Sequence, residues 1–178
     1  MTDLATTLVL GGARSGKSAF AERLVIESGL ARIYLATATA DDEEMKARIA
    51  HHRAQRGQGW STIEEPLALV DALTREATHG RAVLVDCLTL WLSNLMLAGR
   101  DPEIEARRLT RFLGVARYPV IFVSNEVGLG LVPDTPLGRR FRDAQGRLNQ
   151  IMAAAVPDVV FIAAGLPLWL KRSSHTES

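Results

Sequence analysis

Short apolar runs alternate with longer segments of helical spacing along the 178 residues of this chain. Five runs have the nearly continuous Val, Leu and Ile content of strands that helices cover on both faces: 7–10, 32–36, 82–85, 120–123 and 159–163. Between them, apolar residues recur at helical spacing over 18–28, 42–55, 67–78, 88–98, 102–116 and 137–155. This alternation predicts an α/β fold with a doubly wound, mainly parallel sheet and helices on both faces.

The length of the chain suits one domain and is short for two. We predict a single domain over residues 1–172 and a frayed C-terminal tail over 173–178. Gly and Pro concentrate in 56–66 and in 128–136, so long loops are predicted there.

Charge balance, cysteine content and the lengths of the apolar runs limit the functional classes and compartments that fit this chain. With 21 basic and 20 acidic side chains, the chain lacks the basic excess of a nucleic-acid-binding surface, so we expect no nucleic-acid partner. Cys87 is the single cysteine, which excludes an intrachain disulfide, favours a cytoplasmic protein and is interpreted as a small core residue. No apolar run approaches the roughly 20 residues of a membrane span, and the N-terminus lacks a secretory pattern, so we expect no stable membrane insertion.

Residues 11–18, called the phosphate loop below, fit the pattern G-x-x-x-x-G-K-[ST] between a predicted strand and a predicted helix. In this motif the backbone N–H groups and the helix N-terminus face the phosphates of a nucleotide. Lys17 would add charge at the β and γ phosphates, and the Ser18 hydroxyl would be a ligand of Mg²⁺. The alternative is a glycine-rich turn without a ligand. The predicted nucleotide-binding residues here are Gly11, Gly12, Ala13, Arg14, Ser15, Gly16, Lys17 and Ser18.

Asp86 follows the third predicted strand, where a carboxylate can face Ser18 and share a magnesium ion with it. In doubly wound sheets, ligands bind beyond the carboxyl ends of the strands. The alternative role for Asp86 is to cap the helix that begins near Cys87 or Leu88. The predicted metal ligands are therefore Ser18 and Asp86.

A phosphate loop alone leaves the chemistry open. The fourth strand is followed by residues 124–128, Ser-Asn-Glu-Val-Gly, which do not match the N-K-x-D motif of a GTPase. Four arginines in 139–147 could form the lid of a small-metabolite kinase or the solvated face of a helix. A nucleotide sensor without catalysis is a third class, which no feature of the sequence favours. For Asn125 and Glu126, strand-end capping and contact with substrate or metal both stay open.

Two adjacent histidines lie late in the predicted helix over 42–55. His52 shares a face with Met45 and Ile49, while His51 points about 100° away. Each could be a solvated helix residue. The functional alternative is a nucleophile, because an imidazole with a pKa of about 6.5 is largely neutral at cytoplasmic pH and can attack phosphorus.

Together these segments resemble a known family, the bifunctional adenosylcobinamide kinase / adenosylcobinamide-phosphate guanylyltransferases of cobalamin biosynthesis. The resemblance covers nearly the whole chain. It rests on the phosphate loop together with 34–38 (Tyr-Leu-Ala-Thr-Ala), 48–53 (Arg-Ile-Ala-His-His-Arg), 91–95 (Trp-Leu-Ser-Asn-Leu), 124–133 (Ser-Asn-Glu-Val-Gly-Leu-Gly-Leu-Val-Pro), 141–143 (Phe-Arg-Asp) and 146–150 (Gly-Arg-Leu-Asn-Gln). The paired histidines and the Asn-Glu-Val-Gly segment make it specific.

The resemblance implies two transferase reactions on one scaffold. ATP or GTP would phosphorylate the aminopropanol hydroxyl of adenosylcobinamide, and GTP would then donate GMP to that phosphate through a GMP-histidine intermediate to give adenosylcobinamide-GDP. The motif places this nucleophile at His52, with His51 as the weaker candidate. A kinase of another small alcohol, without a covalent guanylyl step, is the alternative.

The resemblance also implies further nucleotide contacts and an oligomer. Asp86 departs from the longer Glu that some members carry, which leaves its contact open. Members of the family form homotrimers, so the same is expected of this chain. The implied contacts, beyond the phosphate loop, are Ala36, Thr37, Ala38, Arg53, Ala54, Gln55, Arg56, Glu64 and Asp86.

Overall fold

The computed structural model describes residues 4–39, 43, 54 and 56–173. Twelve helices and strands have bounds in these residues: β1 (Thr7–Gly11), α1 (Lys17–Glu27), β2 (Ala31–Ala36), β3 (Trp60–Glu64), α3 (Leu69–Glu76), β4 (Arg81–Asp86), α4 (Leu88–Leu97), α5 (Pro102–Leu113), β5 (Val120–Asn125), α6 (Pro136–Ala155), β6 (Asp158–Ala163) and β7 (Leu166–Lys171).

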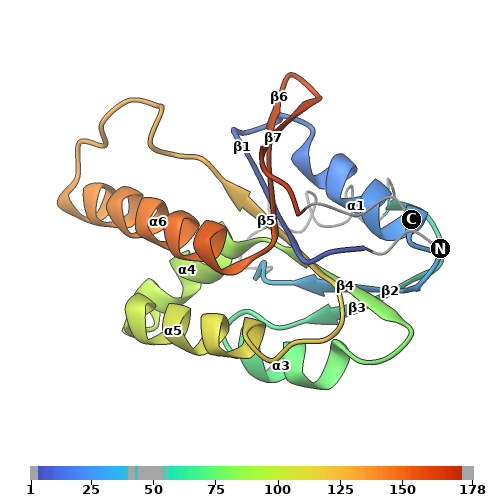
Figure 1. Cartoon of the computed structure of the whole chain (residues 1–178). Coiled ribbons are helices and arrows are strands. Elements are labelled where there is room, and N and C mark those ends of the chain that lie inside the picture. Colours follow the sequence, from blue (N-terminus) through green and yellow to red (C-terminus); the bar gives the residue numbers. More distant parts are fainter. Residues whose placement is uncertain (1–3, 40–42, 44–53, 55, 174–178) are drawn as a thin grey trace.

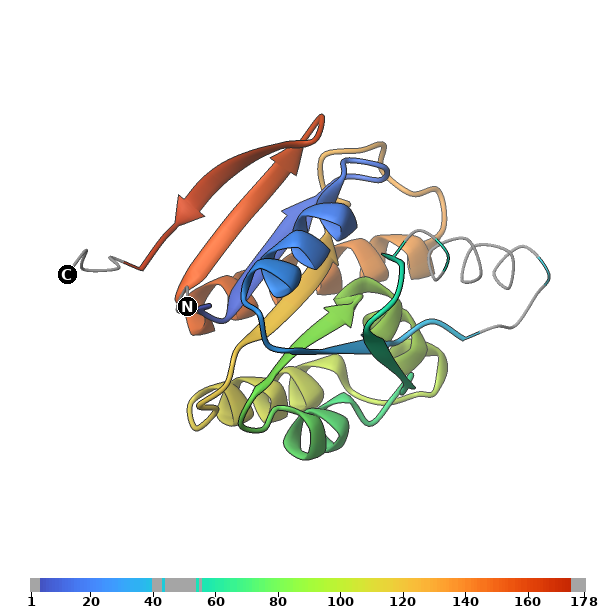
Figure 2. The same ribbon diagram turned by 90° about the vertical axis from the view of Figure 1, so that its right-hand side faces the viewer.

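The strands form one sheet in the order β3-β2-β4-β5-β1-β6-β7. All neighbouring pairs are parallel except β6 and β7, which form an antiparallel hairpin at one edge. Figure 1 shows α1 on one side of the sheet and α3, α4, α5 and α6 on the other, and Figure 2 shows the hairpin standing beyond β1. The predicted α/β fold with a mainly parallel sheet is confirmed.

Each face of the sheet has its own core. The strand side chains that alternate toward α1 pack with Phe20, Ala21 and Val25 of that helix. The opposite side chains pack with the helices of the other layer, where Trp91 and Leu109 are fully buried. The five predicted strands are present with bounds shifted by at most two residues, because their apolar runs lie in the interior of the sheet.

The two edge strands were not predicted. The prediction of a loop over 56–66 is wrong, because β3 occupies Trp60–Glu64, and β7 lies in a segment for which no element was predicted. Both strands have mostly half-exposed or exposed residues, so they lack the continuous apolar run of a central strand. The predicted loop over 128–136 does connect β5 to α6, and α6 begins at Pro136.

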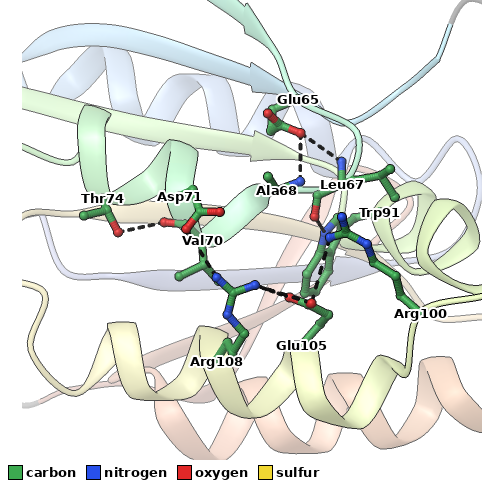
Figure 3. Close-up of polar contacts among 10 residues, drawn as sticks. All are labelled: Glu65, Leu67, Ala68, Val70, Asp71, Thr74, Trp91, Arg100, Glu105 and Arg108. Carbon is green, nitrogen blue, oxygen red and sulfur yellow. Dashed lines mark hydrogen bonds and ion pairs between the residues drawn. The ribbon is translucent and has the colours of Figure 1, made fainter. Parts of the chain in front are cut away.

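Polar contacts tie the β3–α3 connection to the helices below the sheet (Figure 3). The Glu65 carboxylate accepts hydrogen bonds from the backbone N–H groups of Leu67 and Ala68 at 3.1 and 2.7 Å. The Trp91 indole N–H donates to the Leu67 carbonyl at 3.0 Å. Because Trp91 belongs to α4, this bond joins the connection to the helix that follows Asp86.

Candidate active site

The phosphate loop leads from the end of β1 to the start of α1 in a conformation that requires glycine. Gly16 has φ of +93°, in the left-handed region. A Cβ on Gly11 would lie 2.5 Å from Ser15 Oγ and 2.7 Å from the carbonyl oxygen of Ile162, closer than side chains approach one another. The N-cap position of α1 has no side-chain cap, so the helix N-terminus is open to an anion.

Neighbouring strands anchor the phosphate loop at both ends. The Glu126 N–H, just after β5, donates to the Gly11 carbonyl at 3.0 Å. The Gly165 N–H, in the turn between β6 and β7, donates to the Ser15 carbonyl at 2.8 Å. Sequence reasoning missed this second anchor, although Ala164 and Gly165 between two apolar runs are a hairpin signal; both have positive φ.

Lys17 lies at the mouth of the loop near Asp86. Its ammonium group donates to the Gly12 carbonyl at 3.0 Å. Burial lowers the pKa of Lys17, while the charge of the Asp86 carboxylate acts to raise it. Lys17 and Asp86 therefore share one electrostatic environment, although β5 lies between β4, which ends in Asp86, and β1, which leads into the phosphate loop.

Asp86 ends β4 with its carboxylate on the α1 face. The Tyr34 hydroxyl donates to Asp86 Oδ2 at 2.9 Å. The capping alternative for Asp86 is wrong, because α4 begins at Leu88 with Cys87 as its N-cap and no side-chain cap. Cys87 is a buried core residue, as interpreted, and burial raises the pKa of its thiol to about 12.

The register of the sheet aligns three predicted nucleotide contacts side by side on neighbouring strands. Ala36 of β2 pairs with Glu64 of β3 on one side and with Asp86 of β4 on the other. Residues in register on parallel strands face the same side, and Ala36 packs on the α1 face. The structure thus places Ala36, Glu64 and Asp86 in a row at the carboxyl edge.

Hydrogen bonds of Thr37 and Asn94 connect the residues that follow β2, β3 and β4 at this edge of the sheet. The buried Thr37 hydroxyl donates to the Cys87 carbonyl at 2.7 Å and accepts from the Cys87 N–H at 2.8 Å. The Asn94 amide donates to the Thr37 carbonyl at 2.8 Å and to that of Pro66 at 3.1 Å. The Thr37 side chain is therefore engaged by the protein, and Asn94 is a supporting residue that sequence reasoning did not single out.

Arg56 stacks over the aromatic ring of Tyr34. Its guanidinium carbon lies 3.4 Å from the Tyr34 ring centroid and 5.8 Å from that of Trp60, within cation–π range. Its Nη2 donates to Thr62 Oγ1 at 3.2 Å, whereas its Nε has no partner among the described residues. Burial and the neighbouring Asp86 raise the pKa of the Tyr34 hydroxyl, which Arg56 acts to lower. Arg56 thus brings a buried cation to the row formed by Ala36, Glu64 and Asp86.

Known proteins match this chain over almost its whole length. The family model "Cobinamide kinase / cobinamide phosphate guanyltransferase" (CobU) matches residues 7–170. The chain belongs to this family. It is 54% identical over 166 residues to the "Bifunctional adenosylcobalamin biosynthesis protein CobP" of Pseudomonas aeruginosa, covering 92% of this chain and 96% of that protein. It is 37% identical over 179 residues to the "Bifunctional adenosylcobalamin biosynthesis protein CobU" of Escherichia coli K12, covering 92% and 98%.

Solved structures with low sequence identity share the fold of this cobinamide kinase / guanyltransferase family member. The RadB recombinase covers 88% of this chain with 16% identity and a TM-score of 0.51. The P4 protein of bacteriophage phi6 in complex with ADP covers 92% with 16% identity and a TM-score of 0.51. These likenesses confirm the predicted P-loop NTPase type of fold, and the chain is an enzyme of the transferase class through its family.

The residues of this family member suit a magnesium ion. The Ser18 hydroxyl and the Asp86 carboxylate are the oxygen ligands that Mg²⁺ prefers, and the ion usually takes one or two protein ligands together with substrate phosphates and water. Among the described residues, no group of three or more His, Cys, Asp or Glu side chains forms a denser metal site. A site shared with the nucleotide is therefore the arrangement that the donor set supports.

The predicted nucleophile and its neighbours in this family member fall at residues 51–55. His51, His52, Arg53 and Gln55 lie outside the described residues, whereas Ala54 is exposed and helical. In the described part of the chain, no helix has the length and apolar character needed to cross a membrane.

Proposed function

We propose that this enzyme phosphorylates the aminopropanol hydroxyl of adenosylcobinamide with ATP or GTP and then transfers GMP from GTP to that phosphate. The observation that carries the proposal is the phosphate loop with Lys17 near Asp86, in a chain whose match to the family extends over residues 7–170. The names of the relatives support both halves of the proposal.

In the kinase step, the hydroxyl oxygen attacks the γ-phosphorus, the bond from this phosphorus to the β–γ bridging oxygen breaks to release ADP or GDP, and the hydroxyl proton passes to solvent. Such transfers depend mostly on positioning and on neutralisation of charge. The loop N–H groups and the start of α1 bind the phosphates, and Lys17 contacts the β and γ oxygens. Ser18 and Asp86 would hold Mg²⁺, which supplies further neutralisation when it is bound.

In the guanylyl step, an imidazole nitrogen of His52 attacks the α-phosphorus of GTP and releases pyrophosphate. The phosphate oxygen of adenosylcobinamide phosphate then attacks the same phosphorus and restores the free histidine. The cluster of Arg56, Tyr34 and Trp60 supports a nucleotide site here, because the buried Arg56 Nε offers a donor without a partner among the described residues. Ala36, Thr37, Ala38, Arg53, Ala54, Gln55 and Glu64 remain predicted nucleotide contacts.

Two labelled nucleotides test the two halves separately. Transfer of the γ-phosphoryl of ATP or GTP to adenosylcobinamide measures the kinase. For the second half, the enzyme is incubated with Mg²⁺ and α-labelled GTP, denatured, and searched for acid-labile protein-bound GMP. We expect label on wild type and on His51→Ala, and none on His52→Ala. Folded, GTP-binding wild type without covalent label would contradict the guanylyl step and leave a kinase of this or another small alcohol.

The remaining proposals concern the metal, the assembly and the compartment. We expect EDTA to abolish both transfers and added Mg²⁺ to restore them.

We propose a homotrimer in the cytoplasm, which light scattering of the purified protein and fractionation of cells would check. A monomeric mass at working concentration would contradict the trimer.

A further inference from the structure

A buried polar network joins α6 to the carboxyl end of β5. Ser124 and Gln145 are fully buried, and Asn149 is 6% exposed. Ser124 Oγ donates to Asn149 Oδ1 at 2.7 Å, while Gln145 Nε2 donates to Ser124 Oγ and to Asn149 Oδ1, both at 2.9 Å. These polar side chains lie in the helix layer whose core is otherwise apolar, with Leu148 and Met152 on the same helix.

The network holds the backbone of Asn125. Asn149 Nδ2 donates to the Asn125 carbonyl at 3.1 Å, and the Asn125 N–H donates to Thr89 Oγ1 at 2.8 Å. The next residue, Glu126, donates its N–H to the Gly11 carbonyl at 3.0 Å. The end of β5 is therefore fixed by α6, by α4 and by the phosphate loop.

The side chain of Asn125 faces the nucleotide side of the sheet. Val123 packs on the α1 face and Ser124 faces α6, so the period-two alternation of the strand returns Asn125 to the α1 face. Asn125 pairs in register with Gly11, and β5 lies between β1 and β4, the strand that ends in Asp86. Within the described residues, its side-chain amide has no hydrogen-bond partner. The half-exposed amide thus lies between the strands that lead to the phosphate loop and to Asp86, with its donor engaged by no described residue.

We propose that the Asn125 amide contacts the transferring phosphoryl group and that Gln145 and Asn149 are positioning residues that hold it there. The proposal rests on the kinase step proposed above. Asn125 donates a hydrogen bond to an oxygen whose charge changes in the transition state. Gln145 and Asn149 act only through β5.

The network fills this buried space at a cost in folding stability. Gln145 Oε1 is buried without a hydrogen-bond partner in the described part of the chain, and an unsatisfied buried carbonyl is unfavourable. An apolar side chain of similar volume would remove this cost and leave the bond between Ser124 and Asn149 intact. A role in packing alone predicts that such a replacement is harmless, whereas a positioning role predicts slower turnover in a protein of equal or greater stability.

The test compares Asn125→Ala, Asn149→Asp, Gln145→Met and, as a matched control, Gln150→Glu. Gln150 is the exposed neighbour of Asn149 on the same helix. We measure kcat and KM of the kinase step, the dissociation constant of a non-hydrolysable GTP analogue, and stability in urea. We expect kcat to fall roughly a hundredfold for Asn125→Ala and roughly tenfold for Asn149→Asp and Gln145→Met, with the analogue bound within about twofold of wild type.

A double variant separates positioning from a general structural effect. If Gln145 acts through Asn125, adding Gln145→Met to Asn125→Ala costs little further kcat, whereas independent effects multiply. A stable Gln145→Met enzyme with wild-type kcat, or a double variant in which both losses multiply, overturns the proposal. The control variant should match wild type throughout. Wild type without kinase turnover would instead contradict the proposed function.

Discussion

The two faces of the sheet differ in their balance of apolar and charged side chains. On one face, α3, α4, α5 and α6 cover a broad apolar core centred on the fully buried Trp91. On the other face, α1 covers a smaller core, and the carboxyl ends of β2, β3 and β4 carry charged and polar groups at the row of Ala36, Glu64 and Asp86. Among the described residues α1 is the single helix on this face, and the predicted nucleotide contacts lie beyond it at the strand ends. The contrast teaches that substitutions of apolar core residues on the helix-rich face and of charged residues on the α1 face should have separable effects.

The largest expected effect is on the helix-rich face. Trp91→Ala should reduce the free energy of unfolding by about 3–5 kcal/mol, because a large side chain leaves a cavity and Leu67 loses its hydrogen bond. Trp169→Ala is the matched comparison, since Trp169 lies on the edge strand β7 and is only partly buried. We expect a clearly smaller loss there, measured by urea unfolding. Equal losses would contradict the division between the faces.

The second effect belongs to the α1 face. Lys17→Met should lower kcat/KM of the kinase step by roughly 10²–10³-fold without lowering stability, because burial already disfavours the charge of Lys17. Lys171→Met is the control. Lys171 donates to the Val156 carbonyl at 2.6 Å at the end of α6, so its loss should lower stability and leave nucleotide affinity unchanged. Loss of nucleotide affinity in the control would show that the two lysines are not separable.

The sequence predicted the interior of this architecture better than its edges. Fully buried strands such as β4 and β5 leave a continuous apolar run, and the phosphate loop leaves fixed glycines, so both are visible in the amino-acid pattern. The strand β3 is half exposed, and Gly57 and Gly59 before it favoured a loop prediction. The hairpin strand β7 is exposed along most of its length, which leaves only its Ala-Gly turn as a signal.

The polar helix residues that hydrogen-bond to the strand ends were also not predicted from the sequence. Asn94, Gln145 and Asn149 lie on helices where a polar residue normally indicates a solvated face, and only the fold brings their amides to strand ends. For Asp86 the sequence left capping and metal binding open. The structure shows α4 without a side-chain cap, and it shows Asp86 accepting a hydrogen bond from Tyr34, which lies 52 residues earlier and is part of no local pattern.

The third effect tests what the hydrogen bond between Tyr34 and Asp86 contributes. Tyr34→Phe removes the hydrogen bond to Asp86 and keeps the ring under Arg56. A hydrogen bond to a charged group contributes roughly 1.5 kcal/mol, so the free energy of unfolding should fall by about that amount. The freed carboxylate should also require a few-fold higher Mg²⁺ concentration for half-maximal turnover. Tyr118→Phe is the control, because Tyr118 is the only other tyrosine and makes an edge-to-face contact with His79. An unchanged Mg²⁺ requirement would mean that Tyr34 does not orient Asp86 for the metal.

The smallest effect concerns Glu22 of α1, whose charge is unfavourable on the α1 face. Burial raises the pKa of Glu22 above its ordinary value of 4.5, with Arg56 acting to lower it and Asp86 to raise it. The folded protein therefore holds this proton more tightly than the unfolded chain. Stability from this group is fully present below pH 4.5 and is lost as the pH rises through the raised pKa.

Glu22→Gln should consequently be slightly more stable than wild type at pH 7, and the difference should shrink toward pH 4. Urea unfolding of both proteins between these values measures it, with the exposed Glu27→Gln on the same helix as the control. A variant that is less stable than wild type at pH 7 would show that attraction to Arg56 outweighs burial. Glu22 would then stabilise the buried Arg56 guanidinium, and the charges of the α1 face would stabilise one another even without a bound ligand.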